Sequence, residues 1–205
     1  ELKKLNEELV DASGARVLYS FYFGSRNLTA DREIKTPADL DGVKIRSIPF
    51  PIYMAAVEGL GAVPVPVNWS EVPTALATGV VSGQENPVNV VLAHKLYEVQ
   101  SHMMETGHIV AAEMVLINDR VWQGLSDGQK AALSEAAEEV RQKATQYVLD
   151  SEASETAKLR ELGMTVVGAN EGLDLGAFRS AVSDRVMAEF AETYGDFYKQ
   201  VDAIK

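Results

Sequence analysis

Hydrophobic and polar positions follow one another in short blocks along the first half of the chain, and each block fits one strand or one helix. Residues 16–23 (RVLYSFYF) are β-branched and aromatic, which predicts a strand, and residues 43–45 and 63–67 predict two shorter strands. Residues 51–60 and 71–78 predict helices that each end at a glycine. Strands that alternate with helices over short connections predict βαβ units, a parallel-rich sheet and an α/β fold.

The middle of the chain continues this alternation. Thr36 is followed by proline and an acid three residues on, which predicts a capped short helix. Residues 80–84 are expected to be extended and residues 87–95 helical. Two further strands are expected at residues 103–110 and 113–117.

The second half is dominated by one long helical segment. Ser126 and Gln129 form a capping box, and no glycine or proline interrupts residues 129–162. A helix over residues 127–162 would be about 54 Å long, which exceeds a small domain, so we expect it to run along more than one lobe. Residues 166–167 predict a short strand. Asp174 is expected to cap an amphipathic helix, and a last short helix is expected after Tyr194.

Composition excludes several classes of function. The 205 residues contain 19 Lys and Arg against 30 Asp and Glu, a net charge of −11, so a nucleic acid or an anionic membrane surface would be repelled. The absence of cysteine excludes disulfides, thiolate metal sites and cysteine nucleophiles. No apolar stretch approaches the roughly 18 residues of a membrane span, and no signal peptide is visible. Because the chain opens at Glu1 inside a helical pattern, we expect a processing or truncation point there.

Four residues with side chains suited to an organic anion come at or just after the ends of four predicted strands. They are Arg26, Arg46, Trp69 and Asn86. The carboxyl edge of an open α/β sheet is where ligands bind, and arginine matches a carboxylate in bidentate geometry. The residues therefore predict a carboxylate-binding site.

Each of these residues also has a structural interpretation. A surface ion pair with Asp41 would account for Arg46, and a helix N-cap before Pro87 would account for Asn86. Trp69 could equally belong to the core between a strand and a helix. Arg26 could be a solvated loop residue.

Catalytic alternatives find less support. The three histidines, His94, His102 and His108, lack the spacing of a helical metal pair, and no nucleophile elbow, Walker loop or dinucleotide fingerprint occurs. Glu85 could act as a general base beside Asn86, but nothing supplies a paired acid or nucleophile. We therefore expect no catalytic residue, no metal and no cofactor.

Four segments carry a resemblance to a known family. They are residues 36–46 (TPADLDGVKIR), 51–53, 59–87 (GLGAVPVPVNWSEVPTALATGVVSGQENP) and 105–109 (ETGHI). In these segments the chain resembles the DctP-type solute-binding proteins of TRAP transporters. The resemblance extends over nearly the whole chain.

The resemblance implies a periplasmic-binding-protein-like fold of two α/β lobes, joined by hinges and spanned by a long helix. It implies an extracytoplasmic, periplasmic protein without catalytic activity. Such proteins bind an organic acid and deliver it to the membrane subunits of a sodium-coupled transporter.

The resemblance also assigns roles to individual residues. Arg46 corresponds to the arginine that forms the main salt bridge to the ligand carboxylate, and Asn86 to an asparagine that bonds the same carboxylate. Arg26 corresponds to a second arginine facing the ligand and Trp69 to a pocket aromatic. Glu85 corresponds to a neighbour of the cleft.

The family extends further towards the N-terminus than this chain, so the resemblance implies an incomplete first lobe. Residues 24–111 with 151–205 would form the second lobe, and residues 1–23 with 112–150 a remnant of the first. An apolar face is then expected to be uncovered near residues 15–23 and 113–118, where self-association could occur. Two alternatives remain: an enzyme acting on a small organic acid with Glu85 as base, and a non-binding fragment.

Overall fold

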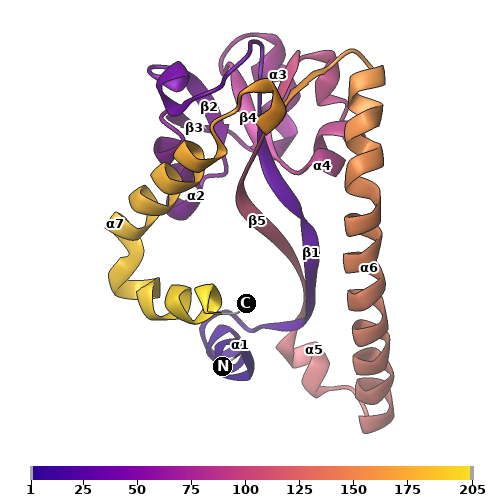
Figure 1. Ribbon diagram of the computed structural model, residues 1–205. Helices are drawn as coiled ribbons and strands as arrows, with labels where there is room; N and C mark the ends of the chain where they lie inside the picture. The colour runs from indigo at the N-terminus through magenta and orange to yellow at the C-terminus, as the bar shows by residue number, and fades with distance from the viewer. Residues whose placement is uncertain (1, 204–205) are drawn as a thin grey trace. The chain divides into compact units, whose positions relative to one another are not determined.

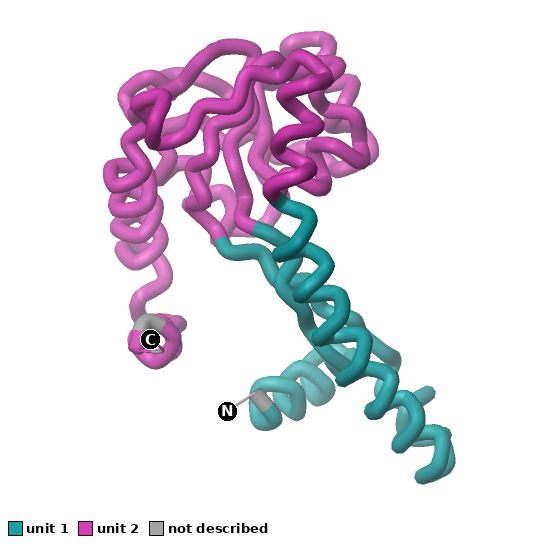
Figure 2. Tube along the Cα trace, turned by 45° about the vertical axis from the view of Figure 1, so that its right-hand side comes forward, with its two compact units in different colours: residues 1–24, 110–152 teal, residues 25–109, 153–205 magenta. Residues whose placement is uncertain are grey.

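The computed structural model describes residues 2–203, which divide into two compact units. Unit 1 comprises Glu1–Gly24 and Val110–Glu152, and unit 2 comprises Ser25–Ile109 and Ala153–Lys205 (Figure 2). The chain passes from one unit to the other inside three regular elements rather than in loops. These elements are β1 (Ala15–Ala30), β5 (His102–Asn118) and α6 (Asp127–Glu161).

Within residues 2–203 the strands form a six-stranded sheet in the order β3-β2-β4-β1-β5-β6. The short strands are β2 (Lys44–Ser47), β3 (Val63–Pro66), β4 (Gly83–Asn86) and β6 (Thr165–Val167). Strand β2 runs parallel to β3 and β4, and β5 runs parallel to β6, whereas β1 is antiparallel to β4. The expected parallel-rich α/β sheet is confirmed, with β1 as the reversed strand.

The α-helices besides α6 are α1 (Leu2–Ser13), α2 (Pro51–Gly59), α3 (Val72–Ala77), α4 (Val88–Ala93), α5 (Asp119–Gln123) and α7 (Leu175–Asp202) (Figure 1). Short 3-10 turns occur at Pro37–Leu40, Trp69–Glu71, Leu96–Glu98 and Ala169–Glu171. The long helix α6 has 35 residues, which confirms the prediction of one uninterrupted helix.

Unit 2 has a hydrophobic cluster on each face of the sheet. Helices α2 and α7 cover one face, where Leu28, Ile45 and Phe178 are fully buried. Helices α3 and α4 and the end of α6 cover the other, with Val91 and Leu159 at its centre. Successive strand residues point to opposite faces, so Met103 belongs to the second cluster and Met104 to the first.

Polar side-chain contacts link the helices and strands of unit 1. The Asn6 side chain bonds both backbone groups of Val17, at 3.0 and 2.8 Å, and Arg16 pairs with Asp119 at 2.6 Å. Alternate residues of β5 in this unit expose apolar side chains: Val110, Met114 and Leu116 are 72%, 60% and 49% exposed. Met114 and Leu116 lie within the range expected to be uncovered, whereas residues 15–23 are mostly half-buried.

Three expectations about element boundaries were wrong. Strand β1 continues to Ala30 instead of ending at Phe23, because pairing with β4 overrides the weak strand propensity of Gly24, Ser25 and Asn27. The two strands expected between residues 103 and 117 are one strand, β5. The separate helix expected after Tyr194 is the continuation of α7, since a helix tolerates Gly195 at a cost of about 1 kcal/mol.

Candidate functional site

The sheet of unit 2 brings the expected site residues to one edge. Because β1 is antiparallel to β4, its residues just after the unit boundary lie beside the carboxyl end of β4, with Asn27 opposite Asn86 and Leu28 opposite Glu85. Strand β2 is parallel to β4, so Arg46 approaches the same edge. Trp69 begins the 3-10 turn that follows β3.

Arg26 lies inside strand β1 and is 5% exposed, so the loop interpretation of this residue was wrong. Its guanidinium pairs with the Glu85 carboxylate in bidentate fashion: Nε donates to Oε2, and Nη2 donates to Oε1 at 2.8 Å. Nη2 also donates to the Glu85 carbonyl at 2.7 Å. The Tyr53 ring lies 5.4 Å from the guanidinium carbon. Arg26 and Glu85 therefore neutralise each other inside the protein.

His108 adds a third group to this pair. Its Nε2 lies 3.5 Å from Glu85 Oε2, and its Nδ1 lies 2.8 Å from the Thr106 hydroxyl. Burial raises the pKa of Glu85, but the polar contacts with His108 and Arg26 outweigh burial and hold that pKa below its usual value of 4.5. A general base works best with a pKa near the working pH, so this environment argues against the catalytic alternative for Glu85.

Sequence reasoning tested His108 only as a metal ligand and missed its place beside Glu85. A cue in the sequence could have pointed to His108, because this residue lies within ETGHI, one of the four segments that carry the family resemblance. No group of His, Cys, Asp and Glu in residues 2–203 could hold a metal ion. Nor is any helix in this described range long and apolar enough to cross a membrane.

Arg46 is 3% exposed, and its Nε donates to the Val67 carbonyl at 3.0 Å. Its guanidinium carbon lies 5.5 Å from the centre of the Trp69 ring. Among the side chains that the structure describes, no carboxylate lies within ion-pair distance of Arg46, so the alternative of a surface pair with Asp41 was wrong. Burial lowers the pKa of Arg46, Glu85 raises it and Arg26 lowers it, but an arginine stays protonated at neutral pH.

Trp69 follows β3 and Asn86 ends β4, and these two strands flank β2, which carries Arg46. Trp69 is half-buried and packs against the second hydrophobic cluster, and its ring meets the His94 ring edge-on with 4.8 Å between the ring centres. Trp69 therefore also packs in the core, the alternative role that the sequence left open. Asn86 is 6% exposed and its Nδ2 donates to Gln84 Oε1 at 2.5 Å. Helix α4 begins after Pro87 without a side-chain cap, so the N-cap interpretation of Asn86 was wrong.

The two arginines and Glu85 at this edge leave one positive charge that no described protein carboxylate neutralises. Arg26 and Glu85 cancel, and Arg46 remains buried without a carboxylate partner among the described side chains. Leaving a buried charge unpaired is costly unless a counter-ion binds there. The arrangement is suited to a single carboxylate.

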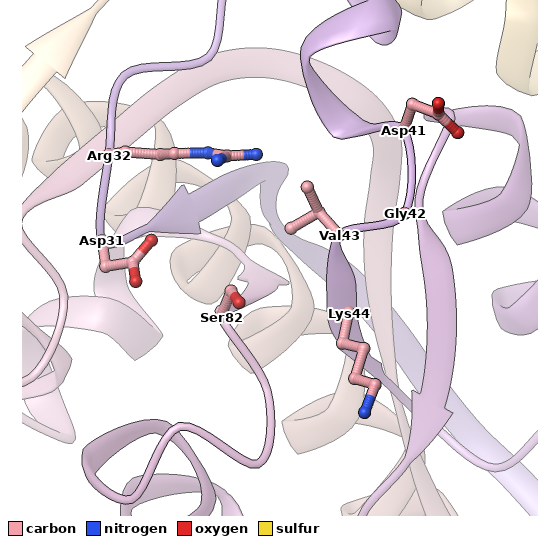
Figure 3. Close-up of a pocket in the computed structure, with 7 residues that line it drawn as sticks. All are labelled: Asp31, Arg32, Asp41, Gly42, Val43, Lys44 and Ser82. Carbon is pink, nitrogen blue, oxygen red and sulfur yellow. The ribbon is translucent and has the colours of Figure 1, made fainter.

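Two surface hollows in unit 2 differ in their relation to this edge. One, of about 440 Å³, is mostly apolar, lies between α2, β5 and α7, and includes Tyr53 and His108 in its lining. The other, of about 480 Å³, is lined by residues that follow β1 and by residues at the starts of β2 and β4 (Figure 3). These residues lie at the opposite edge of the sheet, because Arg46 and Asn86 are near the ends of β2 and β4. Its charged residues are two acids, Asp31 and Asp41, and two bases, Arg32 and Lys44, so their charges balance.

Known proteins resemble this chain over most of its length. Residues 2–193 match the DctP family, described as bacterial extracellular solute-binding protein, family 7. A solute-binding protein of Roseobacter denitrificans is 33% identical over 190 residues, which are 93% of this chain and 57% of that protein. The 2,3-diketo-L-gulonate-binding periplasmic protein YiaO of Escherichia coli is 33% identical over 200 residues, 96% of this chain and 60% of that protein.

The structural comparison agrees. A crystal structure of a TRAP periplasmic solute binding protein from Roseobacter denitrificans with bound L-galactonate superimposes with a TM-score of 0.90 at 31% identity. The match covers 98% of this chain and 66% of that one. The chain thus spans a little more than half the length of these curated relatives.

Proposed function

Because the chain belongs to the DctP family of bacterial extracellular solute-binding proteins, we propose that it serves as the solute-binding component of a TRAP transporter. In this role it binds a small organic acid outside the cytoplasm, in the periplasm, and passes it to the membrane subunits for sodium-coupled uptake. The relatives are named as solute-binding proteins, which supports binding without catalysis.

One observation carries the proposal. Arg46 is a buried cation with no carboxylate partner among the described residues, at a sheet edge where it lies over an aromatic ring. A ligand carboxylate would supply the missing counter-charge and accept two parallel hydrogen bonds from the guanidinium.

The other site residues take supporting roles. Asn86 bonds the same carboxylate through its amide, and Trp69 packs against the body of the ligand. Arg26 adds positive potential, although Glu85 neutralises most of it. Glu85 holds Arg26 in place and does not touch the ligand in this proposal.

The net charge of the site favours a ligand with one carboxylate. A second carboxylate near Arg46 would find no further unneutralised cation among the site residues described above. Two relatives support this proposal, because the L-galactonate and 2,3-diketo-L-gulonate in their descriptions each carry one carboxylate on a polyhydroxylated chain. We therefore propose a monocarboxylic sugar acid.

We further interpret the two compact units as parts of two lobes. Unit 2 would be the second lobe, which carries the anchor, and unit 1 part of the first. From the sequence we expect the chain to cross between the lobes near residues 23, 111 and 150, and these lobe boundaries stay a prediction. The exposed apolar residues of β5 are then a candidate surface for self-association.

Calorimetric titration with matched ligands tests the function. We expect saturable binding of L-galactonate and no binding of L-galactose, which lacks the carboxylate. NMR spectra of the same mixtures should show the acid unchanged over hours. Equal binding of the neutral sugar would contradict the carboxylate mechanism, and new product signals would favour the enzyme alternative.

A further inference from the structure

A chain of buried hydrogen bonds runs from Asn86 into the protein interior. Asn86 Nδ2 donates to Gln84 Oε1 at 2.5 Å, and Gln84 Nε2 donates to the Thr29 hydroxyl at 3.0 Å. The Thr29 hydroxyl donates to Gln100 Oε1 at 3.0 Å. Gln100 Nε2 ends the chain at the backbone carbonyls of Val99 and Ser82, at 3.1 and 3.4 Å.

Strand pairing explains why these side chains meet. Thr29 and Gln84 are directly opposite on β1 and β4, so both point to the same face of the sheet. Asn86 is two residues beyond Gln84 on β4 and shares that face. Glu85, between them, points to the opposite face with Arg26. All four members of the chain are buried, Thr29 and Gln84 completely and Gln100 and Asn86 at 3% and 6% exposure.

The direction of the chain is fixed at its inner end. A backbone carbonyl can only accept a hydrogen bond, so the Gln100 amide must present Nε2 to Val99 and Oε1 to Thr29. The Thr29 hydroxyl has one hydrogen, which it gives to Gln100, so it can only accept from Gln84. Gln84 must therefore turn Oε1 towards Asn86, and Asn86 must turn Nδ2 towards Gln84.

We propose that Gln84 is a positioning residue for the ligand-binding amide of Asn86, and that Thr29 and Gln100 determine which way both amides face. One hydrogen of Asn86 Nδ2 is held by Gln84, which leaves the other to donate to a carboxylate. A reversed Asn86 would present its oxygen to the anion and repel it. This inference rests on the proposed function, because it assumes that Asn86 contacts a carboxylate.

The variant Thr29→Val tests the relay, since valine has the shape of threonine without the hydroxyl. Gln84 then loses the group that fixes its orientation, and Asn86 loses its fixed orientation in turn. We expect the acid to bind about three- to tenfold more weakly, the effect of one neutral hydrogen bond. Thr29→Ser should restore binding because it keeps the hydroxyl. Thr78→Val, which removes an exposed hydroxyl bonded to Thr74 on α3, is the matched control and should bind like the parent.

A second measurement needs no ligand. The two side-chain amide protons of Asn86 in the ¹⁵N-labelled 205-residue chain should shift in Thr29→Val and return in Thr29→Ser. If Thr29→Val does not fold, Gln84→Leu, which leaves the Thr29–Gln100 bond in place, should shift the same signals.

Unchanged Asn86 signals in the folded variants would overturn the inference, as would equal affinities of Thr29→Val and Thr29→Ser. If the parent binds no acid, the proposed function fails, while the amide signals still decide whether the relay orients Asn86.

Discussion

Arg26 and Glu85 lie diagonally across the antiparallel strands β1 and β4, and their side chains, 6% and 1% exposed, form a bidentate ion pair inside unit 2. The pair distinguishes the two arginines of the site by their protein partners. Arg26 forms an ion pair with a protein carboxylate. Arg46 has no carboxylate within ion-pair distance among the described side chains. We therefore expect Arg26 to act mainly on stability and Arg46 mainly on ligand binding.

Arg46→Ala should nearly abolish acid binding. Truncating one partner of a buried charge pair costs roughly 2–5 kcal/mol, which is about 30-fold to several thousand-fold in affinity. Arg46→Lys should also bind poorly, because an ammonium cannot reproduce the bidentate fork. Calorimetric titration of the folded variants measures this, with Arg32→Ala at the opposite sheet edge as the control. An Arg46→Ala protein that binds within about threefold of the parent would refute the anchor role.

Arg26→Ala should act mainly on stability. Removing one member of a buried ion pair leaves the other charged and uncompensated, which costs about 3–5 kcal/mol of unfolding free energy. The double variant Arg26→Met, Glu85→Leu should be more stable than Arg26→Ala, because no buried charge remains. Urea denaturation checks both. A double variant no more stable than the single one would contradict this account.

Stability should depend on Glu85 in acid. Its pKa is lower in the folded protein than the usual 4.5, so the carboxylate contributes stability above that pH and loses it as the pH falls through the folded value. The stability difference between the parent and Glu85→Gln should therefore shrink as the pH falls from about 7 towards 3. Asp39, whose pKa is also lowered by hydrogen bonds from Lys35 and Thr36, contributes equally to both proteins and cancels. A difference that is constant across this range would argue against an ionised Glu85.

Gly83→Ala should destabilise the sheet. A Cβ at this position would lie 2.1 Å from the Thr29 carbonyl oxygen, a backbone atom that cannot move without disturbing the β1–β4 pairing. We expect a loss of about 1–3 kcal/mol. Gly128→Ala is the control, since a Cβ there meets nothing within 4 Å, and alanine in a helix should gain about 0.5–1 kcal/mol. Equal thermal midpoints for the two variants would show that the close approach is unimportant.

The sequence predicted the elements whose signals are local. The capping box at Ser126 and the lack of breakers gave the 35-residue helix, and the Thr36-Pro pattern gave a turn at Pro37–Leu40. The extension of β1 through Ser25 and Asn27 had no local signal, because partners on β4 decide it. For the same reason the sequence left open that Arg26 is a solvated loop residue, an alternative that its burial in β1 rules out.

Sequence reasoning selected residues for the site but could not supply their pairing. Arg26, Arg46, Trp69, Asn86 and Glu85 all lie at one sheet edge, yet nothing in their order along the chain says which arginine Glu85 neutralises. That choice follows from the antiparallel direction of β1 relative to β4. Whether the five residues bind a ligand stays a prediction for the titrations above.

The hydrophobic cluster that joins Leu28 to Phe178 and Val182 also has a consequence for synthesis. Its strands β1 and β2 are synthesised well before helix α7, which covers them together with α2, so this core cannot close until α7 has emerged from the ribosome. Contacts between residues so far apart in sequence also slow folding, because a long loop must be closed before they contribute stability. Until α7 has emerged, this face of the sheet lacks the part of its cover that Phe178 and Val182 of α7 supply.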